Sequence, residues 1–122
     1  MKKILIVEDV NFNLELLTQL LEDDYQLTTA GDGAQGIELA ERERPDLILM
    51  DMSLPVIDGW VAAGRIKSNA NLAHIPIIGL SAHAMNGDIE KALATGCEDY
   101  LTKPLNETLL FEKLEHWLAT AM

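Results

Sequence analysis

The chain alternates short apolar runs with longer stretches in which apolar residues recur at helical spacing. Residues 4–7, 47–50 and 77–80 are continuous apolar runs, a pattern typical of strands buried on both faces of a sheet. Residues 26–30 are more polar and are predicted to form an edge strand, and residues 100–102 are predicted to form a short strand. The apolar runs therefore predict the centre of a sheet, and the polar run predicts one of its edges.

Amphipathic stretches separate these strands. Helices are predicted for residues 12–21, 34–43, 60–68 and 86–95. A last helix is predicted after Asn106, a good N-cap residue, and its apolar stripe consists of Leu110, Leu114, Trp117 and Leu118. Five strands alternating with five helices predict an α/β fold with parallel strands, right-handed crossovers and helices on both faces of the sheet.

Length and composition limit the kinds of protein that fit this pattern. The 122 residues are enough for one domain, and a hydrophobic content of 48% is ordinary for a packed core. A net charge of −11, from 9 basic and 20 acidic residues, argues against direct binding to nucleic acid or to an anionic membrane. Cys97 is the single cysteine, so no internal disulfide can form. We expect a cytoplasmic protein, without a signal peptide or a membrane span.

Polar residues follow four of the five predicted strands. They are Glu8 and Asp9 after the first strand, Asp51 after the third, Ser81 with Ala82 after the fourth, and Lys103 with Pro104 after the fifth. The functional crevice of an open parallel sheet lies beyond the carboxyl ends of its strands. We therefore expect these residues to converge at one edge of the sheet.

This set of side chains fits a divalent cation and a phosphoryl group. Crowded carboxylates repel one another, and a bound Mg²⁺, which prefers oxygen ligands, relieves that repulsion. Lys103 supplies a positive charge for phosphate, and Ser81 supplies a hydroxyl donor. A carboxylate such as Asp51 can attack phosphorus, and phosphoryl transfer needs mainly positioning and charge neutralisation. The pattern predicts an Mg²⁺-assisted phosphoryl site.

The same residues resemble the receiver domain of bacterial two-component response regulators, the CheY-like superfamily. The resemblance covers essentially the whole chain and is carried by Ile6-Val7-Glu8-Asp9, by residues 45–51, by Leu54-Pro55 through Asp58-Gly59, by Leu80-Ser81-Ala82 and by Lys103-Pro104. Residues 72–76, 84–85 and 87–88 look most like single-domain receivers of the DivK type. The resemblance implies a flavodoxin-like, three-layer α/β/α fold with a five-stranded parallel sheet in the order 2-1-3-4-5.

The resemblance also implies a role for each residue of the site. Asp51 is expected to be phosphorylated, and Mg²⁺ is expected to bind Asp9, Asp51 and the main-chain carbonyl of Ser53. Glu8 is expected to act near the ion through water. The expected phosphate contacts come from Met52, Ser81, Ala82 and Lys103. The bond between Lys103 and Pro104 is expected to be cis. Tyr100 matches the switch aromatic, which turns inward as Ser81 is drawn toward the phosphate.

Partners follow from the same resemblance. The phosphoryl donor is expected to be a histidine kinase or a histidine phosphotransfer protein. Output is expected through a downstream effector protein that contacts the last two helices and the last strand, around Tyr100. Residues 1–122 are expected to form one receiver domain without an output domain, either monomeric or dimerising on phosphorylation.

Three other interpretations of the residues remain open. An aspartyl-nucleophile phosphohydrolase would also use Asp51, Ser81 and Lys103, but such enzymes carry an acid two residues after the nucleophile, where Ser53 stands. Gly31-x-Gly33-x-x-Gly36 matches a dinucleotide-binding fingerprint, although the strand before it is the polar one. A binding module that is never phosphorylated would also share the fold. Repeated turnover of an aryl phosphate would distinguish the phosphohydrolase.

Overall fold

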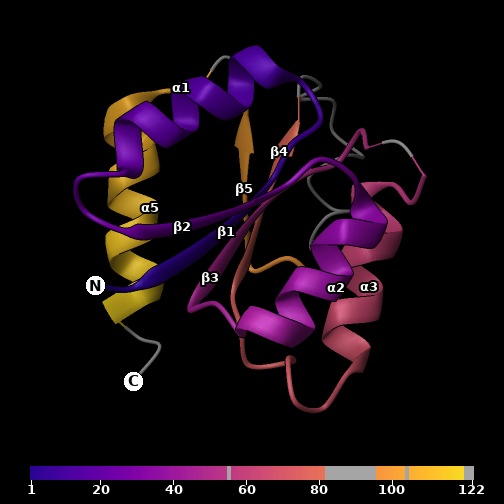
Figure 1. Cartoon of the computed structure of the whole chain (residues 1–122). Coiled ribbons are helices and arrows are strands. Elements are labelled where there is room, and N and C mark those ends of the chain that lie inside the picture. Colours follow the sequence, from indigo (N-terminus) through magenta and orange to yellow (C-terminus); the bar gives the residue numbers. More distant parts are fainter. Residues whose placement is uncertain (55, 82–95, 104, 120–122) are drawn as a thin grey trace.

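The computed structural model describes residues 1–54, 56–81, 96–103 and 105–119 (Figure 1). The strands are β1 (Lys3–Val7), β2 (Gln26–Ala30), β3 (Leu47–Asp51), β4 (Ile77–Ser81) and β5 (Asp99–Thr102). The helices are α1 (Asn11–Leu21), α2 (Gly33–Glu43), α3 (Gly59–Ser68) and α5 (Glu107–Ala119). These elements agree with the predicted ones to within a residue or two, and the helix predicted for residues 86–95 lies outside the described residues.

The five strands form one sheet in the order β2-β1-β3-β4-β5, with parallel pairing throughout. This confirms the expected order. At the carboxyl edge, Val7 lies opposite Met50, Asp51 opposite Leu80, and Ser81 opposite Thr102. Because neighbouring strands end in register, the residues that follow them emerge at one edge of the sheet.

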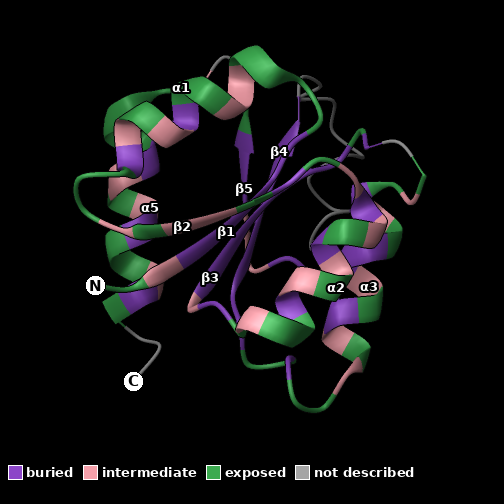
Figure 2. Cartoon of the chain, viewed as in Figure 1, coloured by how far each residue is buried: buried purple, intermediate pink, exposed green. Residues whose placement is uncertain are grey.

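Helices cover both faces of the sheet, which makes three layers (Figure 1). Side chains alternate between the faces along each strand. Leu5, Val7 and Met50 belong to the core cluster that packs with α2 and α3, and Ile4 and Ile6 belong to the cluster that packs with α1 and α5. Figure 2 shows β3 and β4 buried and β1 buried beyond its first residue, whereas β2 is partly exposed along most of its length, as predicted for an edge strand.

Local hydrogen bonds fix where the helices begin. The Asn106 carboxamide oxygen accepts from the Leu109 N–H at 3.0 Å, which confirms the predicted N-cap of α5. Asp32 caps α2 through the Gln35 N–H at 2.8 Å, and Asp58 caps α3 at 3.0 Å. The Asp58 cap ends the loop that follows Asp51, so α3 begins at a fixed distance from the phosphoacceptor candidate. None of the described helices is long and apolar enough to span a bilayer.

Candidate functional site

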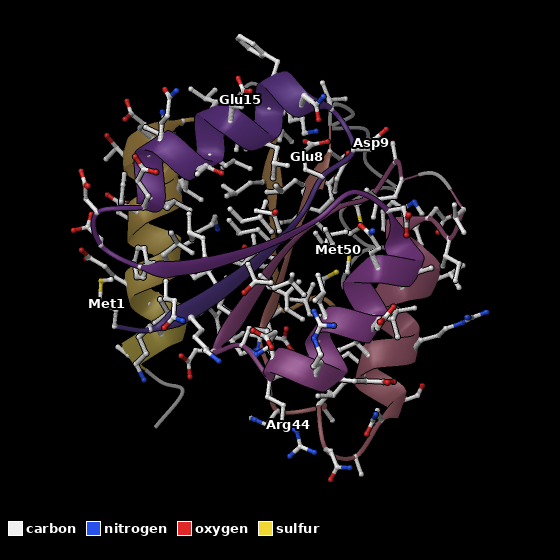
Figure 3. The ribbon with its side chains drawn as sticks, viewed as in Figure 1. Met1, Glu8, Asp9, Glu15, Arg44 and Met50 are labelled. Carbon is white, nitrogen blue, oxygen red and sulfur yellow. The ribbon has the colours of Figure 1, made fainter. Side chains whose placement is uncertain are left out.

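Three carboxylates meet at the carboxyl edge of the sheet. Glu8 and Asp9 follow β1, Asp51 ends β3, and one oxygen from each lies within 4.8 Å of the others. Glu8 and Asp51 are buried, at 1% and 4% exposure, whereas Asp9 faces solvent. Glu8 and Asp9 lie together at the upper end of the sheet in Figure 3, opposite the end marked by Arg44. The predicted convergence of these acids is confirmed.

Lys103 brings a positive charge to the two buried acids. Its Nζ lies 2.6 Å from Oε1 of Glu8 and 3.5 Å from Oδ2 of Asp51. The Lys103 N–H donates to the Ser81 carbonyl at 2.7 Å, which extends the pairing of β4 and β5 by one residue and places the side chain over the pocket. Burial opposes the charge of Lys103, but the hydrogen bond with Glu8 and the charge of Asp51 outweigh it and raise the pKa of Lys103.

Lys103 affects the pKa values of the two buried acids differently. Burial, together with the neighbouring Glu8 carboxylate, raises the pKa of Asp51 to about 6. Burial also opposes ionisation of Glu8, but its hydrogen bonds with Lys103 and Asp51 lower the pKa of Glu8. With three carboxylates around one ammonium, the described part of the pocket carries excess negative charge. A cation added beside Asp9 and Asp51 would relieve it, and an all-oxygen donor set suits Mg²⁺.

One donor in the pocket was missed from the sequence. The Ser53 N–H donates to Oδ1 of Asp51 at 3.2 Å, whereas the sequence pointed only to the carbonyl of this residue. An amide two residues beyond an aspartate is the usual partner in an Asx turn, so the Asp-Met-Ser spacing was the available signal. The Met52 N–H instead donates to the Leu80 carbonyl at 2.9 Å, as part of the sheet.

The two switch candidates are both buried. Ser81 ends β4 at 3% exposure, opposite Thr102 of β5. Tyr100 is 8% exposed and belongs to the core cluster beneath α2 and α3. Its ring lies beside Gly79, where an added Cβ atom would be 3.4 Å from Cδ2 of the ring. The predicted site residues Ala82 and Pro104 lie outside the described residues.

An apolar groove that sequence reasoning did not find adjoins the acids. Its volume is about 290 Å³, and it runs between α1 and the segment that follows β5. Glu8 and Lys103 lie among its lining residues, and the apolar ones include Phe12, Leu16 and Leu105. Phe12 is 74% exposed and Leu16 is 45% exposed. Their exposure is visible only once α1 is docked, because the periodicity of the helix assigned its leucines to the core.

The fold and the pocket together define a class of protein. It is a doubly wound α/β domain with acids after β1 and at the end of β3, a hydroxyl at the end of β4 and a lysine after β5, all at the carboxyl edge of the sheet. Residues 4–115 match the family model described as response regulator receiver domain, and the chain belongs to this family. The resemblance inferred from the motifs is therefore confirmed.

Individual relatives cover nearly the whole chain. The polar-differentiation response regulator DivK of Brucella anthropi is 37% identical over 121 residues, which are 98% of each chain. The receiver domain of the sensor histidine kinase PA1611 from Pseudomonas aeruginosa, solved with a magnesium ion in its active-site cleft, is 40% identical, with a TM-score of 0.91 and 98% of each chain covered. The receiver domain of Ssk1 from Saccharomyces cerevisiae, solved with the histidine phosphotransfer protein Ypd1, is 31% identical, with a TM-score of 0.90, and the match covers 97% of this chain and 89% of that one.

Proposed function

We propose that the protein is a phosphorylation-controlled switch of a two-component phosphorelay, in which Asp51 accepts the phosphoryl group with the help of Mg²⁺. The observation that carries this proposal is the environment of Asp51. It is a buried carboxylate with a pKa near 6, held within 3.5 Å of Lys103 and beside two further acids. Above that pKa the side chain is ionised and can act as a nucleophile toward phosphorus.

The proposed phosphoryl transfer forms one bond to phosphorus and breaks another. An oxygen of Asp51 forms the new P–O bond, and the bond from phosphorus to the donor breaks, with its electron pair leaving on the donor atom. For a phosphohistidine donor this is the P–N bond, and the imidazole leaves. Lys103 offsets the negative charge that gathers on the phosphoryl oxygens.

Mg²⁺ fits the donor set of this pocket. We assign Asp9, Asp51 and the carbonyl of Ser53 as its protein ligands, with Glu8 acting through water. The all-oxygen cluster and the magnesium ion of the Pseudomonas relative support this assignment. When bound, the ion supplies the positive charge that the three acids lack.

The output of the switch is proposed to pass through Ser81 and Tyr100. A phosphoryl group on Asp51 adds strong acceptor oxygens, which attract the Ser81 hydroxyl, the amide of Ala82 and the ammonium of Lys103. Ser81 lies two residues beyond Gly79, which pairs with Tyr100 and adjoins its ring, so a shift of Ser81 would reach the space around that ring. Rearrangement there alters binding of an effector protein on the face formed around β5 and α5.

The proposed phosphoryl donor is a histidine kinase or a histidine phosphotransfer protein. The Ypd1–Ssk1 complex shows a related receiver bound to such a protein. The apolar groove beside Glu8 and Lys103 supports this choice, because a protein that delivers a phosphoryl group to Asp51 must contact the adjoining surface. We further propose a cytoplasmic location and one receiver domain over residues 1–122, which regulates a partner protein.

Intact mass measurement tests the phosphoryl site. The protein is incubated with acetyl phosphate in the presence and absence of Mg²⁺, as wild type, as Asp51→Asn and as Asp23→Asn, an exposed acid remote from the pocket. Wild type and Asp23→Asn gain one phosphoryl group when Mg²⁺ is present, and Asp51→Asn gains none. Phosphorylation of Asp51→Asn would refute the assignment, and repeated turnover of an aryl phosphate would point to a hydrolase.

A further inference from the structure

The glycine motif at the start of α2 has a contact role that the nucleotide-binding interpretation does not explain. A Cβ atom added to Gly33 would overlap the carbonyl oxygen of Ile57 and lie 2.7 Å from its carbonyl carbon. Ile57 belongs to the loop between Asp51 and α3. On Gly31 an added Cβ atom would meet only Gln35, at 3.7 Å, and on Gly36 it would meet the Val7 side chain, at 3.0 Å. Of the three glycines, Gly33 alone approaches the loop.

A second glycine holds the other end of the same loop. An added Cβ atom on Gly59, the first residue of α3, would overlap the Asp51 carbonyl oxygen and lie 2.6 Å from Cα of Met52. The Gly59 N–H donates to the Met52 carbonyl at 3.2 Å. The chain therefore leaves the sheet at Met52 and returns to it at Gly59, and between these points Ile57 lies against α2.

The loop also holds a strained residue. Val56 has φ 68°, a conformation that is costly for a β-branched side chain, and its side chain is 81% exposed. Strained backbone persists only where the surrounding structure holds it in place. The contact of Ile57 with Gly33, one residue later, supplies such a restraint, and the Ile57 side chain packs against the core beneath α2 and α3.

We infer that Gly33 is a positioning residue for the phosphoryl site, because the absence of a side chain there lets α2 hold the Asp51–Gly59 loop at its outer end. The loop carries Ser53, whose N–H donates to Asp51 and whose carbonyl is a proposed metal ligand. A methyl group at Gly33 pushes the Ile57 carbonyl outward, and the displacement reaches Ser53. This inference rests on the proposed Mg²⁺-dependent phosphorylation, although its first readout does not.

The test compares Gly33→Ala with Gly31→Ala, a change in the same motif whose added Cβ atom makes only an ordinary van der Waals contact with Gln35. Amide hydrogen exchange reports the loop directly, and the N–H groups of Ser53 and Gly59 exchange faster in Gly33→Ala than in wild type. Calorimetry with MgCl₂ gives a Mg²⁺ affinity about tenfold lower for Gly33→Ala than for wild type. This is the low end of the loss seen when groups that orient metal ligands are disturbed. The initial rate with acetyl phosphate at subsaturating Mg²⁺ falls by a similar factor. Gly31→Ala matches wild type in all three.

Two further variants separate positioning from stability. Ile66→Val removes a methyl group from the buried face of α3 without touching the loop, and it lowers stability without changing Mg²⁺ affinity. Ile57→Ala keeps Gly33 but removes the side chain that packs the loop against the core beneath α2 and α3. It tests the inference if Gly33→Ala does not fold. Unchanged exchange and Mg²⁺ affinity in folded Gly33→Ala, or in Ile57→Ala, would overturn the inference. A wild type that binds no Mg²⁺ would refute the proposed function instead, since the exchange readout needs no metal.

Discussion

An ionic cluster lies at each end of β5, and the two clusters differ in how well positive charge balances their acids. At the start of the strand, Asp99 accepts from Lys113 at 2.7 Å and from the Trp117 indole at 3.0 Å, and both donors belong to α5. Beyond the end of the strand, Lys103 meets Glu8 and Asp51. The first cluster matches an acid with donors, whereas the second gathers more carboxylates than its lysine can neutralise.

The pKa values follow this difference. Burial opposes ionisation of Asp99, but its hydrogen bonds with Lys113 and Trp117 outweigh burial and lower the pKa of Asp99. Burial and Glu8 together raise the pKa of Asp51 to about 6. Asp99, whose charge is balanced, ties α5 to β5. Asp51 lacks a full balancing charge, so an added cation or phosphoryl group alters its electrostatic environment.

Removing the lysine of each cluster gives the largest contrast. Lys103→Met leaves Glu8 and Asp51 buried without their ammonium, and it lowers the free energy of unfolding at pH 7 by about 3 kcal/mol. Lys113→Met costs about 0.5–1 kcal/mol, because Lys113 and Asp99 are both partly exposed and solvent screens the pair. Urea unfolding of the two variants measures both values.

The pH dependence provides the control for this comparison. Near pH 5 Asp51 is largely protonated, so the loss caused by Lys103→Met shrinks, whereas the loss caused by Lys113→Met stays the same because the pKa of Asp99 is lowered. Equal losses from the two lysines at pH 7 would contradict the distinction between the clusters.

Asp51→Asn is expected to raise the free energy of unfolding, whereas the two lysine substitutions lower it. The folded pKa of Asp51, about 6, lies above its usual value of 3.8, so ionisation of this side chain opposes folding. The opposition is absent below the unfolded pKa, grows between pH 4 and 6, and is complete above that range. Asp51→Asn therefore raises the free energy of unfolding at pH 7 by about 1–2 kcal/mol, and by little near pH 4.

Urea unfolding over this pH range measures the effect. Asp99→Asn is the matched variant at the other end of β5, and it destabilises the protein at pH 7, because its ionised form is the stabilised one. A loss of stability in Asp51→Asn at pH 7 would show that the acids of the proposed phosphoryl site are satisfied in the absence of a metal.

The sequence was sufficient to predict the residues of the cluster beyond the end of β5. Glu8, Asp51 and Lys103 each follow a predicted strand, and parallel strands that end in register bring such residues together whatever the details of packing. The Asp99 cluster was not predicted, because it depends on which side of α5 faces β5, and an apolar stripe fixes that rotation only coarsely. Asp99 precedes the predicted strand, residues 100–102, and gave no signal of its own.

The contact between Gly33 and Ile57 was hidden for a related reason. The spacing of the three glycines matches a dinucleotide-binding fingerprint, but the sequence does not contain the distance between α2 and the loop after β3. That distance is set by the packing of two helices against one face of the sheet, between residues 24 positions apart. Local patterns predicted each element here, and the contacts between elements needed the assembled fold.

Trp117→Phe removes the second α5 donor of the Asp99 cluster, and its expected effect is about as small as that of Lys113→Met. The substitution keeps an aromatic ring between α5 and the sheet but removes the indole donor to Asp99, and it lowers the free energy of unfolding by about 1 kcal/mol. Because Lys113 and Trp117 share Asp99, the double variant with Lys113→Met loses an amount different from the sum of the single losses. Phosphorylation of Asp51 by acetyl phosphate stays at the wild-type yield in both variants, because β5 lies between the two clusters. Additive losses would mean that Asp99 does not couple the two donors, and a reduced yield would mean that the ends of β5 communicate.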